Sequence, residues 1–185
     1  QAISNLLDAK KSDDNSPNIT LLLVEAYLKT NQFDKAKELT QKLVNAQPQN
    51  SYFQKQHGIA LGLSGDIEKA RAAFLEAVKL QPENSDAIIH LARMEFIAQG
   101  PESAITLLKS KVELQPKNTK LIVELADLYL KIGQMDNALA QYQQAFDFDN
   151  QNVFTLTKLV DYFFITKKYS KAEPILLAYL QKHPK

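Results

Sequence analysis

The chain has 185 residues, and its 22 basic and 21 acidic residues leave a formal net charge of +1. This balance argues against nucleic-acid binding, which normally needs a basic face to neutralise phosphates. The absence of cysteine excludes disulfides and thiolate metal sites. No run of about 18 apolar residues occurs, so the sequence predicts no membrane-spanning helix.

Residues 1–16 are predicted to form one helix, the second helix of a preceding repeat. Proline then marks a period of 34 residues: Pro48, Pro82 and Pro116 are evenly spaced, and Pro184 lies two periods further on. Such a period is typical of a solenoid, in which each repeat is one supersecondary unit stacked on the next. The predicted repeats, in one continuous array, are residues 17–50, 51–84, 85–118, 119–152 and 153–185.

Each repeat is predicted to contain two helices joined by a tight turn. In the second repeat, apolar or small residues at helical spacing lie on both sides of Ser64-Gly65-Asp66, which is a helix stop followed by a turn. The chain is therefore expected to be all-α, with eleven helices and no strand.

Asparagine closes four of the repeats, and its side-chain oxygen can accept from the N–H groups that open the next helix. We expect the same role for Ser16 in the first repeat. Small residues also recur at the period of 34, where two helices can approach closely. The asparagines are Asn50, Asn84, Asn118 and Asn152; the small residues are Val24, Gly58, Ala92, Ala126 and Val160 in the first helices, and Ala36, Ala70, Ala104, Ala138 and Ala172 in the second.

These residues resemble the tetratricopeptide repeat family over essentially the whole chain. The similarity lies in the small residue of the first helix, the aromatic residue or leucine three positions later, the alanine that opens the second helix, and the closing proline. Thr40 departs from the pattern, because the family usually has a large apolar residue there. The resemblance implies a right-handed superhelical solenoid whose inner face is lined by the first helix of each repeat.

No catalytic pattern accompanies the repeats. The three histidines, His57, His90 and His183, lie in separate segments without metal-ligand spacing, and no nucleophile elbow or phosphate-binding loop is present. We expect no enzyme activity, no cofactor and no metal.

The resemblance places candidate partner-binding residues on the inner face. They mix apolar side chains with charges of both signs, which is typical of a partner-facing strip, although single apolar residues among them could instead pack against the neighbouring first helix. We expect the strongest anchors at Ile89, Arg93 and Phe96, with Val123 and Asp127 beside them. The full set is Leu21, Glu25, Lys55, Ile59, Ile89, His90, Arg93, Phe96, Val123, Asp127, Thr157 and Asp161.

The sequence therefore predicts a scaffold that binds a peptide or protein segment in a concave groove. It also resembles repeat arrays of bacterial envelope and exopolysaccharide-export lipoproteins, including those linked to PEP-CTERM sorting, which favours a secretion-related assembly and the periplasm over the cytoplasm. Two alternatives remain. One is a structural spacer or self-assembly element with weak self-association through its ends, and the other is an accessory segment of a larger enzyme such as a glycosyltransferase.

Overall fold

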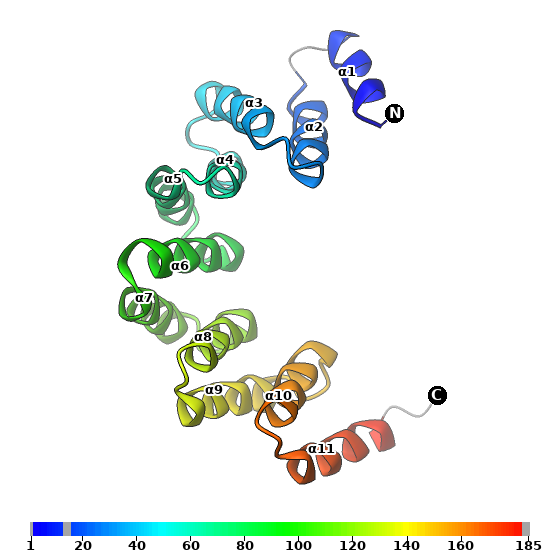
Figure 1. Ribbon diagram of the computed structural model, residues 1–185, viewed down its shortest axis with the longest axis vertical. Coiled ribbons are helices and arrows are strands. Elements are labelled where there is room, and N and C mark those ends of the chain that lie inside the picture. The colour runs from blue at the N-terminus through cyan, green and yellow to red at the C-terminus, as the bar shows by residue number, and fades with distance from the viewer. Residues whose placement is uncertain (1, 13–15, 183–185) are drawn as a thin grey trace. The chain divides into compact units, whose positions relative to one another are not determined.

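A computed structural model describes residues 2–12 and 16–182, and these residues form eleven α-helices and no strand (Figure 1). The all-α prediction and the predicted number of helices are confirmed. None of the helices described is both long and apolar enough to cross a bilayer. The chain divides into two compact units, Gln1–Gly100 and Pro101–Lys185, which are treated in turn.

The first unit contains six helices that pack in chain order. Helices that are neighbours in the chain contact each other, and α4 also contacts α6. The helix predicted over residues 1–16 is observed as α1, which is shorter than predicted and ends at Ser12; Ser16 precedes α2, and residues 1 and 13–15 lie outside the described part of the chain. The helices are α1 (Ala2–Ser12), α2 (Pro17–Lys29), α3 (Phe33–Ala46), α4 (Ser51–Leu63), α5 (Ile67–Leu80) and α6 (Ser85–Gln99).

The second unit contains five helices with the same order of packing. Each pair of consecutive helices is in contact, and α8 also contacts α10. Pro174 lies inside the last helix. The helices are α7 (Pro101–Leu114), α8 (Thr119–Lys131), α9 (Met135–Phe148), α10 (Val153–Ile165) and α11 (Tyr169–Lys182).

Asparagine caps the first helix of four repeats, as the sequence predicts. Asn50 accepts a hydrogen bond from the backbone N–H of Phe53, and Asn84 and Asn118 make equivalent bonds at α6 and α8. At α10, Asn152 accepts from the backbone N–H of Phe154, two residues later.

The prediction for Ser16 is wrong, because its side chain makes no capping bond. Pro17 at the first position of α2 has no N–H to satisfy and presets the helical φ angle, so fewer donors there need a cap. The Ser16 carbonyl accepts instead from the backbone N–H and the hydroxyl of Thr20.

Four of the turns between paired helices contain a residue in the left-handed conformation. These residues are Asn31, Gly65, Gly133 and Lys167, with φ of 57°, 87°, 79° and 57°. In each turn, the backbone N–H of the residue that follows the left-handed one donates to the carbonyl oxygen five residues earlier, as from Asp66 to Leu61 at 2.9 Å. This bond satisfies a carbonyl in the last turn of the first helix. The turn after α6 differs, because α6 continues to Gln99 and Gly100 has the positive φ.

The small residues predicted at helix crossings are buried. Ala36, Ala70 and Ala138 are 0% exposed, and Gly58 lies directly against the ring of Phe74. A Cβ built on Gly58 would lie 2.7 Å from Phe74 Cε1, inside van der Waals contact. This position therefore needs glycine for the close approach of α4 and α5.

Candidate functional site

A depression of about 480 Å³ lies between the first helices of the first two repeats, α2 and α4. The predicted inner-face residues Leu21 and Glu25 of α2 line it. Its full lining is Asn18, Leu21, Leu22, Val24, Glu25, Leu28, Tyr52 and Gln56.

The depression combines exposed apolar groups with charges. Leu22 and Tyr52 are 51% and 45% exposed, and both line this depression, so together they form an exposed apolar patch. The Nζ atom of Lys55 lies 5.1 Å from the centre of the Tyr52 ring, and Glu25 pairs with Lys29 at 2.6 Å. The surface therefore offers apolar contact area beside a cation and an anion.

The remaining candidates of the first unit do not line this depression. Ile59 is half-buried on α4, one turn beyond Lys55. On α6, Arg93 is exposed whereas Ile89 and Phe96 are half-buried. His90 stacks on Phe74 of α5, with ring centres 5.1 Å apart and planes at 8°. His90 belongs to the predicted inner-face set, but its ring packs against α5, the second helix of the preceding repeat.

In the second unit, Asp127 of α8 holds three helices together. Its carboxylate accepts from the hydroxyl of Tyr142 on α9 and from Nζ of Lys158 on α10, the latter at 2.7 Å. Burial, and then the bond to Asp127, raise the pKa of Tyr142, so its hydroxyl stays protonated and remains the donor. Thr157 and Asp161 lie exposed on α10.

Val123 does not fit the prediction of an exposed apolar anchor, because it is only 2% exposed. The physical reason is the enclosure of α8, which is packed by α7, α9 and α10 and buries residues around most of its circumference.

Tyr142 is not singled out by the sequence reasoning. A comparison between repeats could have found it, because the two preceding repeats have Phe74 and Leu108 at the position of Tyr142. A tyrosine in such a series fills the same core position and adds a hydroxyl that needs a buried partner.

No group of three or more histidines or carboxylates in the described residues could hold a metal ion. His57 and His90 lie on separate helices, α4 and α6, and His183 lies outside the residues that the structure describes.

Consecutive helix pairs, a period of 34 residues and small residues at the crossings define a helical repeat solenoid. Two tetratricopeptide repeat models match the chain, one over residues 1–56 and 95–160 and the other over residues 55–119. The chain belongs to the tetratricopeptide repeat family.

Solved structures show the same fold at low sequence identity. The chain is similar to TTC0263, a thermophilic tetratricopeptide repeat protein of Thermus thermophilus, with 20% identity, 88% of this chain and 89% of that chain covered, and a TM-score of 0.70. It is also similar to PilF of Pseudomonas aeruginosa, with 20% identity, 97% and 82% covered, and a TM-score of 0.65.

A third similar structure is YrrB, described as a tetratricopeptide repeat protein with an unusual peptide-binding site. It shares 16% identity, with 100% of this chain and 95% of that chain covered and a TM-score of 0.58. Among curated proteins, none matches the chain.

Proposed function

We propose that the chain is a protein-interaction scaffold that binds a peptide or protein segment along its first helices and catalyses no reaction. The observation that carries this proposal is the depression between α2 and α4, where Leu22 and Tyr52 expose large apolar surfaces beside Lys55 and Glu25. The family membership of the chain and the similarity to a peptide-binding repeat protein support it.

The chemistry of the depression favours a segment with an apolar anchor. Leu22 and Tyr52 would bury further area against such an anchor, and tyrosine is among the commonest residues that dominate binding energy. Lys55 and Glu25 would then select charges on either side of the anchor, which contributes more to specificity than to affinity. Both helices are held by their packing partners α3 and α5, so little ordering is needed on binding.

The test is a selection of linear twelve-residue peptides, displayed on phage, against the 185-residue chain. A selected peptide should bind at least about tenfold more weakly to the double variant Leu22→Ala and Tyr52→Ala, because each truncation removes a contact of at least about 1 kcal/mol. Fluorescence anisotropy with the labelled peptide measures the affinity.

The matched control replaces two exposed leucines outside the depression, Leu75→Ala on α5 and Leu114→Ala on α7. This control should leave the affinity unchanged. Equal weakening in both double variants would contradict the assigned site, and so would equal binding by wild type and the Leu22/Tyr52 variant.

A second candidate function is self-association through the last helices. Phe164 and Tyr169 pack edge to face with ring centres 5.4 Å apart, yet they remain 53% and 54% exposed. Ile165, Leu177 and Leu180 are each more than half exposed on the same two helices. Such a surface favours weak association with another copy.

Sedimentation over a range of concentrations tests this second function. The average mass should rise with concentration for wild type, and the rise should disappear in Leu177→Ser with Leu180→Ser. A constant monomer mass at millimolar concentration would exclude it.

The wider setting that we propose is a bacterial secretion-related assembly in the envelope. Its support is the sequence resemblance to envelope and export arrays. Fractionation of the source cells tests it, and recovery of the protein from the cytoplasm alone would contradict it.

A further inference from the structure

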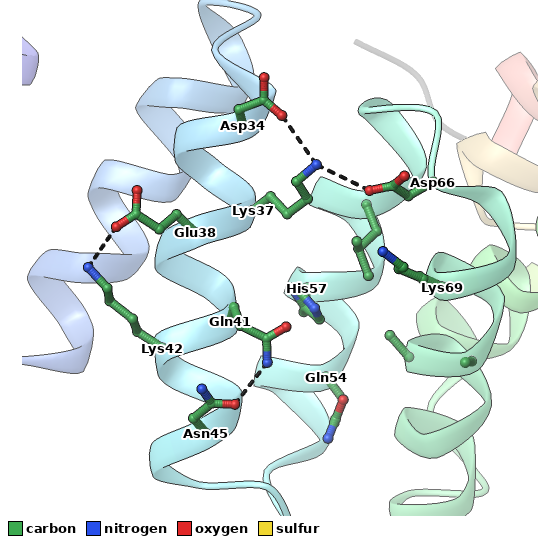
Figure 2. Close-up of a pocket in the computed structure, with 13 residues that line it drawn as sticks. Asp34, Lys37, Glu38, Gln41, Lys42, Asn45, Gln54, His57, Asp66 and Lys69 are labelled. Atoms are coloured by element: carbon green, nitrogen blue, oxygen red, sulfur yellow. Dashed lines mark hydrogen bonds and ion pairs between the residues drawn. The ribbon is translucent and has the colours of Figure 1, made fainter.

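The first unit contains a second and larger groove, of about 850 Å³, between the second helices α3 and α5 (Figure 2). Its floor is the face of α4 that carries Gln54, His57 and Leu61. Gln41 and Asn45 of α3 and Lys69 and Ala72 of α5 contribute to its walls. The groove shares no lining residue with the depression between α2 and α4.

At the floor, a buried imidazole is fixed by a buried threonine. Nδ1 of His57 lies 2.9 Å from the Thr40 hydroxyl, and the two residues are 8% and 0% exposed. That hydroxyl also lies 2.9 Å from the Ala36 carbonyl and 3.0 Å from that of Lys37. Because its one proton goes to these carbonyls, the network assigns the imidazole proton to Nδ1, which donates to Thr40.

The other ring nitrogen, Nε2, is then a hydrogen-bond acceptor. The structure gives it no hydrogen bond, and no fully buried side-chain nitrogen or oxygen in the described residues is unpartnered. Nε2 therefore reaches the surface of the groove that His57 lines. Burial, followed by the nearby charge of Lys37, lowers the pKa of His57, which keeps the ring neutral and Nε2 able to accept.

Packing alone does not require this polar pair. Leucine occupies the position of His57 in every other repeat, at Leu23, Leu91, Leu125 and Leu159. Thr40 stands where the following repeats have Phe74, Leu108, Tyr142 and Leu176. Both exceptions fall at the same contact and together leave an acceptor in the floor of the groove, where an apolar pair would stabilise the fold at least as well.

Polar amides on the wall and floor of the groove can form hydrogen bonds with a peptide main chain. Nε2 of Gln41 donates to Oδ1 of Asn45 at 2.8 Å, which leaves the Gln41 oxygen and the Asn45 nitrogen available as one acceptor and one donor. Nε2 of Gln54 donates to the Pro48 carbonyl oxygen at 2.9 Å, and the side-chain oxygen of Gln54 remains as a further acceptor.

The charges of the groove disfavour a strongly ionic ligand. Three lysines and three carboxylates line it, so they cancel. Lys37 bonds Asp66 at 3.1 Å and Asp34 at 3.2 Å, and Lys42 bonds Glu38 at 2.8 Å, as Figure 2 shows. Nucleic acid would find neither an excess of positive charge nor, apart from His57, an aromatic ring on which a base could stack.

We propose that the groove between α3 and α5 binds an extended polypeptide segment of a partner protein, one of whose main-chain N–H groups donates to Nε2 of His57. Gln41 and Asn45 bond the neighbouring peptide groups of the same segment. The groove is thus a second binding site, independent of the proposed site between α2 and α4.

The test begins with the 185-residue chain that carries Leu22→Ala and Tyr52→Ala, so that binding between α2 and α4 is already weakened. Linear twelve-residue peptides displayed on phage are selected against this variant. A selected peptide should bind at least about tenfold more weakly after Gln41→Ala with Asn45→Ala, because two hydrogen bonds to the peptide are lost. In wild type, the ¹⁵N resonance of His57 Nε2 should shift when the peptide is added.

The matched control is Gln143→Ala with Asp147→Ala on α9, which has the same spacing and a hydrogen bond of 2.9 Å between the two side chains. The affinity should not change in this control. Both pairs lie on helix surfaces, so neither is expected to unfold the chain; His57→Phe adds a direct test at the floor, with its melting temperature recorded.

Three results would overturn the proposal: recovery of no binding peptide, unchanged binding by the Gln41/Asn45 variant, or an unmoved His57 resonance. None of them bears on the site between α2 and α4, which is tested by the affinity of the Leu22/Tyr52 variant for peptides selected on wild type.

Discussion

Gly58 and Gly62 lie one turn apart on α4, but only Gly58 is packed too closely to accept a methyl group. We predict that Gly58→Ala destabilises the chain by about 1–3 kcal/mol, since the new Cβ would overlap the ring of Phe74. Urea unfolding followed by circular dichroism measures the change in the free energy of unfolding.

Gly62→Ala is the matched control on the same helix. Its added Cβ would lie 3.6 Å from Met94 Sδ, at ordinary contact distance. Alanine is favoured over glycine inside a helix by about 0.5–1 kcal/mol, so this variant should be slightly more stable than wild type. Equal effects of the two substitutions would contradict the packing described for Gly58.

The buried His57 should make the chain less stable in mild acid. Its pKa in the folded chain is lowered by burial and by Lys37, whereas in the unfolded chain it ionises near 6.5. As the pH falls below about 6.5, the unfolded chain takes up this proton first, and the free energy of unfolding decreases.

The measurement compares urea unfolding of wild type and His57→Leu from about pH 7.5 to about pH 5. Wild type should lose more stability than the variant over this range, and because the other two histidines are present in both proteins, the difference isolates His57. Parallel stability curves would show that His57 is not buried in a neutral form.

At single residues, the sequence predicts what depends on the repeat and misses what depends on contacts between repeats. The buried alanines and the asparagine caps follow from their register alone. The register places Val123 on the inner face of α8 and so predicts that it is exposed. It does not show how many other helices pack around α8. The bonds of Asp127 to Tyr142 and Lys158 join three helices, and no spacing along the chain indicates them.

Among the elements, the turns between paired helices carry a conformational cost that the sequence can relieve. Lys167 has a φ of 57°, where a side chain with a Cβ is strained by about 1–2 kcal/mol. Lys167→Gly should therefore stabilise the chain by about 0.5–1 kcal/mol after the greater freedom of glycine in the unfolded state is counted. Thermal unfolding measures the gain.

Asn31→Gly provides the comparison, because Asn31 has the same φ in the equivalent turn. Asparagine tolerates the left-handed conformation better than lysine, so this gain should be smaller. A larger gain at Asn31 than at Lys167 would mean that backbone strain does not limit these turns.

The helices themselves could be predicted because their signals are local. Each signal lies within one repeat: asparagine before the helix, apolar residues at helical spacing along it, and glycine or asparagine after it. The exception is α6, which extends to Gln99, and the positive φ falls on Gly100, one position later than in the other repeats. A shift of one residue in a turn changes little in the apolar pattern, so this pattern does not indicate the longer helix.

For the whole molecule, the arrangement of contacts matters more than any single core. Within each unit, helices contact mainly their neighbours in the chain, so stability should be close to a sum of repeat terms and interface terms. The period alone predicts this kind of stability. It cannot place the two grooves of the first unit, since each depends on which side chains of two neighbouring repeats are large, small or polar.

The last prediction concerns the first unit by itself. We expect residues 1–100 to fold when produced alone, because α1 to α6 form a continuous series in which each helix packs against the next. The fragment should show a helical circular dichroism spectrum and a cooperative melt, at a lower temperature than the whole chain, which has more repeats to contribute interface energy. It should also retain the Thr40–His57 contact, visible as the same His57 Nδ1 resonance in both proteins. A disordered fragment would show that the first unit depends on residues beyond Gly100, and stability could then no longer be treated as a sum over neighbouring helices.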